Sequence, residues 1–165
     1  MKKAIEKTGR KIKGFQQVLG CTKLKTSYYI VLIGNGQFHA LNLARQNKHV
    51  ILYSNGSSML IGEKEREKYQ KRIQASLNLF LHANTIGVII STKPGQNRLN
   101  EAKELVKRLS RKYPQKIFYS FISSHINTAE FENFSIDFWI NTACPGLVND
   151  SPKIVNIDDI IEFFS

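Results

Sequence analysis

This sequence contains little cysteine and no long apolar run, and each absence excludes a class of protein. No stretch approaches the roughly 20 apolar residues that span a bilayer, so we expect no membrane insertion. The basic start, residues 1–7, is not followed by the apolar segment of a secretory signal. The 2 cysteines are expected to stay reduced in the cytoplasm, which argues against a structural disulfide. We therefore predict a cytoplasmic protein.

The chain does have the length and apolar content for a buried core. Its 165 residues are 42% hydrophobic and 22% charged, which is ordinary for a globular protein with one compact domain or two small ones. A net charge of +11 invites a nucleic-acid-binding interpretation. The Lys and Arg residues, however, are spread over the N-terminus and two predicted helices instead of gathering in a recognised motif. Net charge alone is therefore a weak indication of what the protein binds.

Strand-like and helix-like patterns alternate along the chain, which is typical of an α/β fold with parallel sheets. The predicted strands are 28–33, 49–53, 85–91, 116–122 and 135–141, and the predicted helices are 2–11, 38–46, 62–83, 96–113 and 156–164. We predict an α/β fold of two small units of parallel sheet flanked by helices. The units are residues 1–82, which carry Cys21, and 83–165, which carry Cys144; one continuous sheet remains an alternative.

Four segments with chemically useful residues follow predicted strands or apolar runs. In open parallel sheets, ligands bind outside the carboxyl ends of the strands, so these segments are predicted to share one rim. They also have simpler interpretations, as ordinary strand exits, buried thiols and a structural histidine. The segments are Gly20-Cys21, residues 34–39, residues 91–96 and residues 142–145.

Familiar cofactor motifs are incomplete in these segments. The glycines at Gly34 and Gly36 begin a dinucleotide-binding fingerprint, but His39 occupies its third glycine position. Residues 91–96 lack the spacing of a phosphate-binding P-loop. Cys21 and Cys144 are too far apart for a local metal knuckle, and two thiolates are an incomplete set for zinc or for an iron–sulfur cluster. The residues alone therefore indicate a rim site without naming its chemistry.

Taken together and in order, the segments VLGCT (18–22), GNGQFHAL (34–41), STKPGQNR (91–98) and IDFWINTACP (136–145) resemble motifs of one family, 2-(3-amino-3-carboxypropyl)histidine synthase of diphthamide synthesis. The resemblance covers the chain from about residue 15 to its end. It implies three similar α/β domains, each giving one cysteine to a 4Fe-4S cluster that binds S-adenosylmethionine. The implied enzyme is an aminocarboxypropyl transferase. It acts through a 3-amino-3-carboxypropyl radical on a histidine of translation elongation factor 2.

The resemblance also assigns roles to individual residues. Cys21 corresponds to the middle-domain cluster ligand and Cys144 to the last-domain ligand. His39 corresponds to a position near the active site, where it is expected to contact the methionine part of the cofactor or to orient the acceptor. The residues expected to line the cofactor site from a family loop are Lys93, Gly95, Gln96 and Arg98.

Two departures from the family pattern leave alternatives open. The family's first domain and its cysteine are not matched, so we expect a partner chain to supply them, in an assembly expected to be dimeric. Gly146 stands where the family usually has Arg after the Cys-Pro pair. One alternative is therefore a non-catalytic subunit or degenerate remnant of the enzyme. Another is an unrelated basic RNA-binding protein.

Overall fold

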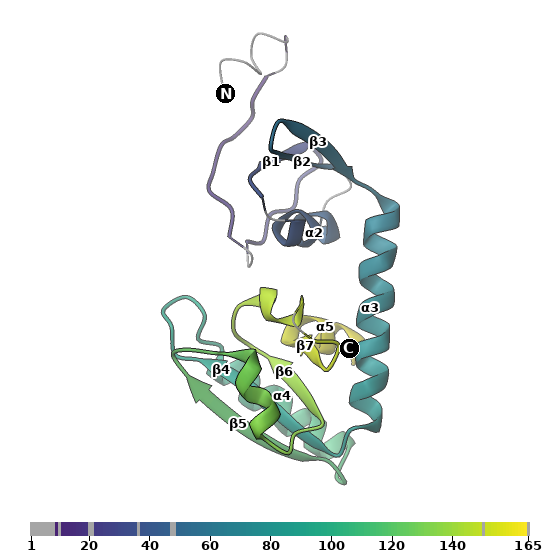
Figure 1. Cartoon of the computed structure of the whole chain (residues 1–165), viewed down its shortest axis with the longest axis vertical. Coiled ribbons are helices and arrows are strands. Elements are labelled where there is room, and N and C mark those ends of the chain that lie inside the picture. Colours follow the sequence, from purple (N-terminus) through teal and green to yellow (C-terminus); the bar gives the residue numbers. More distant parts are fainter. Residues whose placement is uncertain are drawn as a thin grey trace.

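The computed structural model describes residue 9 and residues 11–19, 22–35, 37–46, 49–149 and 151–164. Two β-sheets are stacked along the long axis of the molecule and joined by the helix α3, Glu63–His82 (Figure 1). The N-terminal unit is the first sheet with helix α2, Gln37–Gln46. The C-terminal unit is the second sheet with helices α4, Leu99–Lys112, and α5, Ile157–Phe163.

The N-terminal sheet has three strands in the order β1-β2-β3. Strand β1, Ile30–Ile33, runs parallel to β2, Val50–Ser54. Strand β3, Ser57–Ile61, returns antiparallel to β2. The tight turn between β2 and β3 has positive φ at Asn55 (49°) and Gly56 (80°), the conformation for which an Asn-Gly pair is preferred in hairpins. Helix α2 covers one face of this sheet through Ala40, Leu43 and Ala44.

Helix α3 extends from the N-terminal sheet to the far end of the C-terminal unit (Figure 1). Glu65 accepts a hydrogen bond from the backbone N of Gly62 at 2.9 Å, which satisfies a donor at the start of the helix. Ile73, Leu77 and Phe80 recur at three- and four-residue spacing and are buried against the C-terminal sheet. The second half of the helix is therefore part of that core.

The C-terminal sheet has four parallel strands in the order β5-β4-β6-β7. One face packs on α3, α4 and α5. The other packs on two 3-10 helices and their loops, η1 (Thr128–Asn133) and η2 (Pro145–Asn149), around Trp139. Both faces are therefore covered, as parallel strands require. The strands are β4 (Thr85–Ser91), β5 (Ile117–Ser123), β6 (Phe138–Asn141) and β7 (Ile154–Asn156).

The predicted α/β class with parallel sheets flanked by helices is confirmed. Strands β3 and β7 were not predicted, and β3 makes the first sheet mixed instead of purely parallel. The boundary between residues 82 and 83 stays a prediction. The predicted helix 2–11 lies mostly outside the described residues. Among the described residues, no helix combines the length and apolarity needed to cross a membrane.

Candidate functional site

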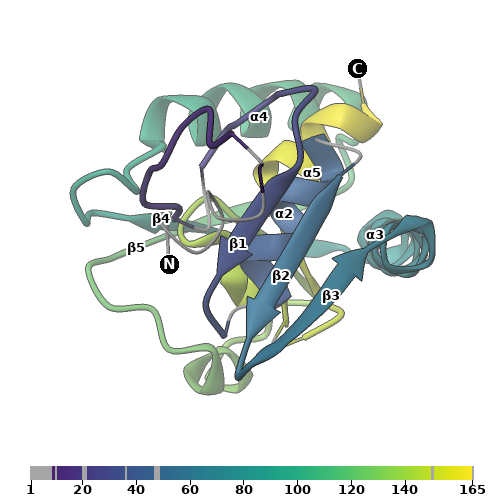
Figure 2. The ribbon, with the colours of Figure 1, turned by 90° about the horizontal axis from the view of Figure 1, so that it is seen from above.

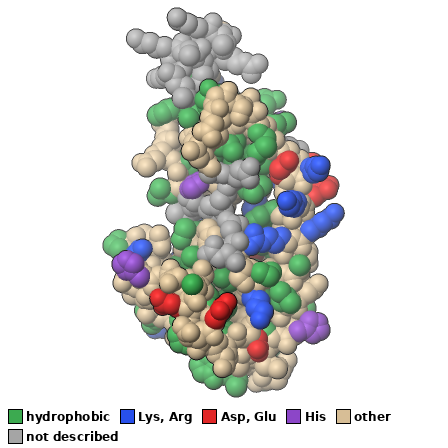
Figure 3. Space-filling model, in the orientation of Figure 1, with side chains coloured by type: hydrophobic (Ala, Val, Ile, Leu, Met, Phe, Trp, Pro, Cys, Tyr) green, Lys and Arg blue, Asp and Glu red, His purple; other side chains and the backbone are tan. Residues whose placement is uncertain are grey.

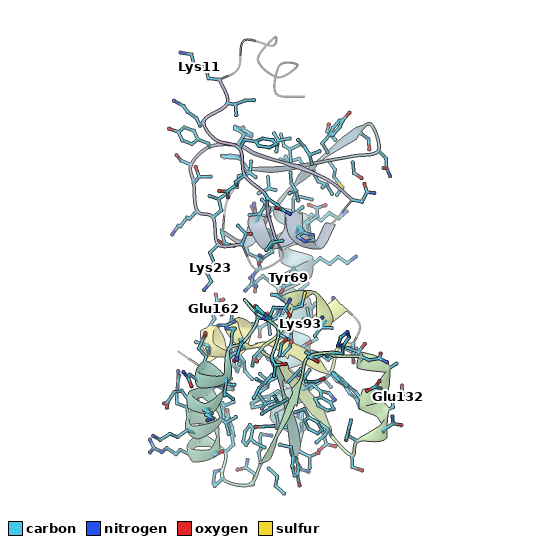
Figure 4. All side chains as sticks on the ribbon, turned by 90° about the vertical axis from the view of Figure 1, so that its left-hand side faces the viewer. Lys11, Lys23, Tyr69, Lys93, Glu132 and Glu162 are labelled. Atoms are coloured by element: carbon cyan, nitrogen blue, oxygen red, sulfur yellow. The ribbon has the colours of Figure 1, made fainter. Side chains whose placement is uncertain are left out.

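The carboxyl edge of the C-terminal sheet is the best candidate for a site. Strands β4 and β6 are parallel neighbours, so the segments that follow them begin at the same edge. Lys93 follows β4 and Cys144 follows β6. Figure 4 labels Lys93 at the end of the C-terminal unit that faces the N-terminal unit. Two of the four predicted rim segments are therefore brought together.

The backbone of the Cys144 loop is held by two buried asparagines. Asn141 Nδ2 donates to the carbonyl oxygen of Cys144 and to Asn156 Oδ1, both at 2.8 Å. Asn141 Oδ1 accepts from the backbone N of Ala143 at 2.9 Å, and Asn156 Nδ2 donates to the carbonyl oxygen of Pro145 at 3.3 Å. Cys144 itself is exposed and is a free cysteine. The loop thus presents a thiol outward from a fixed backbone.

The segment after β4 makes a tight turn over the same edge. The backbone N of Gln96 donates to the carbonyl oxygen of Lys93 at 3.0 Å, with Pro94 and Gly95 between them. Gly95 has φ of +76°, and a turn with Pro at its second position and positive φ at its third is type II, where Gly is favoured. Gly95 therefore shapes the loop, while Lys93 remains exposed on it.

Arg98 is occupied by two carboxylates. It donates to Asp158 Oδ2 at 2.9 Å and Oδ1 at 2.8 Å, and it also pairs with Glu101. These hydrogen bonds lower the pKa of Asp158 and of Glu101 and raise the pKa of Arg98. Arg98 therefore joins the start of α4 to the start of α5 beside the edge, and much of its fork of donors is already used.

The predicted residues of the N-terminal unit lie partly outside the described residues. Cys21 and Gly20 belong to that part of the chain, so the predicted approach of Cys21 to Cys144 stays a prediction. Thr22 is described, and its backbone N donates to the carbonyl oxygen of Leu19 at 3.0 Å. Its neighbour Lys23 is labelled at the end of the N-terminal unit that faces the C-terminal unit (Figure 4).

Electrostatics support this position of Lys23. Its ammonium group is close enough to help lower the pKa values of Asp158 and Glu101, after the larger effect of Arg98. The chain next to Cys21 is therefore on the side of the N-terminal unit nearest to α4 and α5. His39 lies in the first turn of α2 and is half-buried.

An ion pair links the two units. Arg45 of α2 pairs with Asp159 of α5 (Nη2 to Oδ1, 2.5 Å), and the guanidinium of Arg45 lies 5.1 Å from the ring centre of Tyr69 of α3. Asp159 is only 3% exposed. Burial raises the pKa of Asp159 against the opposing attraction of Arg45. This cluster, like the Asn141–Asn156 pair, was not predicted, because each joins side chains that are separate in the sequence.

The donor chemistry at this edge fits one ligand of an iron–sulfur cluster. Cysteine thiolate is the usual protein ligand of such clusters, and Cys144 is exposed at the carboxyl edge. Within the ranges that the structure describes, no three His, Cys, Asp or Glu side chains gather into a group that could hold a metal ion. Cys144 is the only cysteine among the described residues, and Cys21 lies outside them.

Comparison with known proteins gives a consistent result. A sequence model of the family described as "Putative diphthamide synthesis protein" matches residues 1–153. A 2-(3-amino-3-carboxypropyl)histidine synthase of Pyrococcus horikoshii is 30% identical over 132 residues, 78% of this chain and 38% of that protein. A protein of the same name from Methanocaldococcus jannaschii is 32% identical over 139 residues, 81% of this chain and 40% of that protein. The chain thus spans about two fifths of the length of these curated relatives.

Solved structures show the same correspondence in three dimensions. The crystal structure of Dph2 from Pyrococcus horikoshii matches with a TM-score of 0.74 and 28% identity, over 87% of this chain and 44% of that chain. The crystal structure of Dph2 from Pyrococcus horikoshii with a 4Fe-4S cluster matches with a TM-score of 0.73 and 28% identity, over 87% of this chain and 43% of that chain.

Proposed function

Because the chain belongs to the diphthamide synthesis protein family, we propose that it forms part of an iron–sulfur aminocarboxypropyl transferase. In this proposal the complete enzyme transfers a 3-amino-3-carboxypropyl group from S-adenosylmethionine to a histidine of translation elongation factor 2. The observation that carries the proposal is the free, exposed thiol of Cys144 at the carboxyl edge of a parallel sheet. A solved relative with this fold carries a 4Fe-4S cluster.

The ligands that this chain would give the cluster are Cys144 and Cys21. The chemistry that the cluster supplies is one-electron cleavage of a sulfonium carbon–sulfur bond in S-adenosylmethionine. Asn141 and Asn156 hold the backbone at Cys144 and at Pro145, so the Cys144 thiol would already be positioned before a cluster binds. The two asparagines would thus orient a metal ligand without contacting the metal themselves.

Lys93 and His39 are proposed to contact S-adenosylmethionine or the acceptor histidine. Lys93 is exposed beside the same edge and carries the charge that attracts a carboxylate such as that of the methionine part. His39 is proposed to contact that part or to orient the acceptor histidine. Gln96 and Gly95 shape the loop between Lys93 and Arg98.

A third cysteine from a separate polypeptide is proposed to complete the ligand set, because the sequence contains 2 cysteines and the cluster is expected to use three. The test is to purify the complex from its own cells without oxygen and to reconstitute it with iron and sulfide. A brown complex with broad visible absorption is expected. A complex that stays colourless would contradict the proposal. The Cys144→Ala variant should lose the colour, and Ser123→Ala, at the end of neighbouring β5, should keep it.

A non-catalytic subunit is the second candidate, and Gly146 favours it. If an Arg after the Cys-Pro pair helps to hold anionic groups of the cofactor, its replacement by Gly removes that contact. The Cys21→Ala and Cys144→Ala variants discriminate between the candidates in an assay that measures transfer to elongation factor 2. A purely structural subunit should tolerate both changes, whereas a cluster ligand should not.

A further inference from the structure

The start of helix α5 makes contacts in two directions. Asn156, the residue before α5, accepts a hydrogen bond at 2.8 Å from Asn141, which holds the Cys144 loop. Asp159, in the first turn of α5, pairs with Arg45 of α2 in the N-terminal unit. Figure 2, a view along the long axis of the molecule, shows α2 partly in front of α5, with α3 end-on to one side. One short segment therefore touches both the Cys144 loop and the N-terminal unit.

Tyr69 of α3 stands between these two contacts. Its Oη lies 3.5 Å from Arg45 Nη1 and 3.5 Å from Asp159 Oδ2. Burial and the Asp159 carboxylate raise the pKa of Tyr69, and a side-chain hydrogen bond from Asn156 opposes them. Figure 4 labels Tyr69 between the two units. Side chains from α2, α3 and the start of α5 therefore meet at one hydroxyl group.

This cluster differs from the charged pairs on the outside of α3. Figure 3 shows Lys, Arg, Asp and Glu side chains mixed along the surface of this helix. Arg66 pairs there with Glu63, whose side chain is 82% exposed, and pairs in solvent hold their partners weakly. Asp159 is buried and Tyr69 is half-buried. The contacts of Tyr69 are therefore placed to fix a neighbouring side chain.

The side chain that Tyr69 can fix is the amide of Asn156. Asn156 is 5% exposed, and a buried amide needs partners for both of its N–H donors. One partner is the carbonyl oxygen of Pro145, at 3.3 Å, and the other is the Tyr69 hydroxyl. Without that hydroxyl, one buried donor is unpaired. The amide is then expected to turn, and Asn141 would lose its fixed acceptor.

The geometry points to Tyr69 as a positioning residue for Cys144. Through Asn156 and Asn141, its hydroxyl group ties the Cys144 loop to the contact between the two units. The inference rests on the proposed function, because Cys144 is there a cluster ligand, and residues that orient a metal ligand affect how tightly the metal is held. The same cluster would then set the arrangement of the units and the position of the thiol.

A nitroxide spin label on Cys144 tests this inference in the full chain, with Cys21→Ser so that one thiol reacts. Electron paramagnetic resonance measures the motion of the label in the folded protein, which a small loss of stability does not change. Tyr69→Phe removes only the hydroxyl group. Tyr113→Phe is the matched control, because Tyr113 is also half-buried against the C-terminal core but lies just before β5, at the opposite edge of the sheet.

The expected result is a more mobile label in one variant only. Tyr69→Phe should shorten the rotational correlation time of the label roughly twofold, and Tyr113→Phe should leave it unchanged. Equal spectra from the two variants would overturn the proposal. Asn156→Ala should also free the label, and adding Tyr69→Phe to it should bring no further change, because Tyr69 acts through Asn156. A further increase in mobility in the double variant would overturn this route.

The label needs no iron, so the inference and the proposed function fail separately. A label freed by Tyr69→Phe, in a protein whose complex stays colourless after reconstitution, leaves the link between Tyr69 and the Cys144 loop standing and removes the iron–sulfur enzyme. A brown complex with equal label spectra does the reverse. In a brown complex, Tyr69→Phe should also lose its visible absorption to an iron chelator several-fold faster than Tyr113→Phe. Equal rates of loss would overturn the positioning role.

Discussion

The two sheets of this chain differ in how far other elements cover their faces. In the C-terminal sheet both faces are buried, one by α3, α4 and α5 and the other by the 3-10 helices and their loops around Trp139. In the N-terminal sheet, the described side chains that form a buried cluster lie on the face toward α2. The comparison teaches that the described part of the C-terminal unit has a core on both faces of its sheet, while the described part of the N-terminal unit has a smaller core on one face.

The two units also differ in how charge is distributed. All acidic residues except Glu6 lie at or after Glu63. Among the described residues, the carboxyl groups with an altered pKa are Glu101, Asp137, Asp158 and Asp159, all on the C-terminal side of the chain. The acid sensitivity of folding is expected to reside in the C-terminal unit and in its junction with α2.

The largest effect is expected from emptying the C-terminal core. Phe80 is fully buried, and its ring contacts those of Tyr113, Phe138 and Phe164 edge-on. Phe80→Ala should lower the free energy of unfolding by about 3–5 kcal/mol, through lost burial and the cavity left behind. Urea denaturation followed by circular dichroism measures it. Leu81→Ala, at a half-exposed neighbouring position, should change stability by less than about 1 kcal/mol.

The next effect concerns the link between the units. Arg45→Met should cost about 3 kcal/mol, because Asp159 stays buried without its cationic partner. The pKa of Asp159 is raised in the folded state by burial, so its neutral form is favoured there and the penalty of ionising it grows as pH rises through the folded pKa. The deficit of the variant should therefore shrink toward acid pH.

Denaturation curves at several pH values measure this deficit. Arg66→Met is the matched control, because Arg66 pairs with the exposed Glu63 on α3, and it should cost less than about 1 kcal/mol at every pH. An Arg45→Met deficit that is equally large in acid would show that Asp159 is not the group involved.

A smaller effect is expected at the carboxyl edge. Arg98→Gln should cost about 1 kcal/mol, since its partners Glu101 and Asp158 are partly exposed and solvent screens them. Hydrogen bonds from Arg98 lower the pKa of Asp158, so this stabilisation is present above the unfolded pKa of Asp158 and is lost as pH falls through the folded one. Thermal melts of variant and wild type should converge in acid. Parallel curves at all pH values would contradict this assignment.

The smallest effect on stability is expected at an exposed position of the N-terminal sheet. Leu60→Thr, on the face of the N-terminal sheet away from α2, should change the stability of the isolated chain by less than about 0.5 kcal/mol, because the Leu60 side chain is already exposed. Leu52→Ala on the α2 face of the same sheet should cost about 2–5 kcal/mol. Similar losses from both variants would mean that Leu60 is covered in the isolated chain.

Much of the fold could be predicted because its signals are local. The apolar run of β4 and the three- and four-residue spacing of Ile73, Leu77 and Phe80 on α3 each fall within one segment. The family motifs are local as well, which is why four short segments indicated the family that the comparison confirmed. Strand β7 has three residues, too few for a periodicity to be seen. Strand β3 did have a local signal, because Asn55-Gly56 is a pair typical of a hairpin turn.

The candidate site was predictable only where its parts are sequence motifs. Cys144 and Lys93 were predicted at one rim, and β4 and β6 place their segments there. Asn156 was not singled out for the site; it stands just before α5, but its side chain bonds Pro145 and Asn141 across the loop. Asp158, which pairs with Arg98, and Asp159, which pairs with Arg45, are distant from these arginines in the sequence, and only the packing of α5 brings them together.

The way the two units are joined constrains how they can move. Helix α3 attaches them along one side, and the Arg45–Asp159 contact attaches α2 to α5 at a second point. Any movement of one unit away from the other along α3 would have to break the Arg45–Asp159 pair, so the separation of Lys23 from Lys93 depends on this ion pair as well as on the two cores.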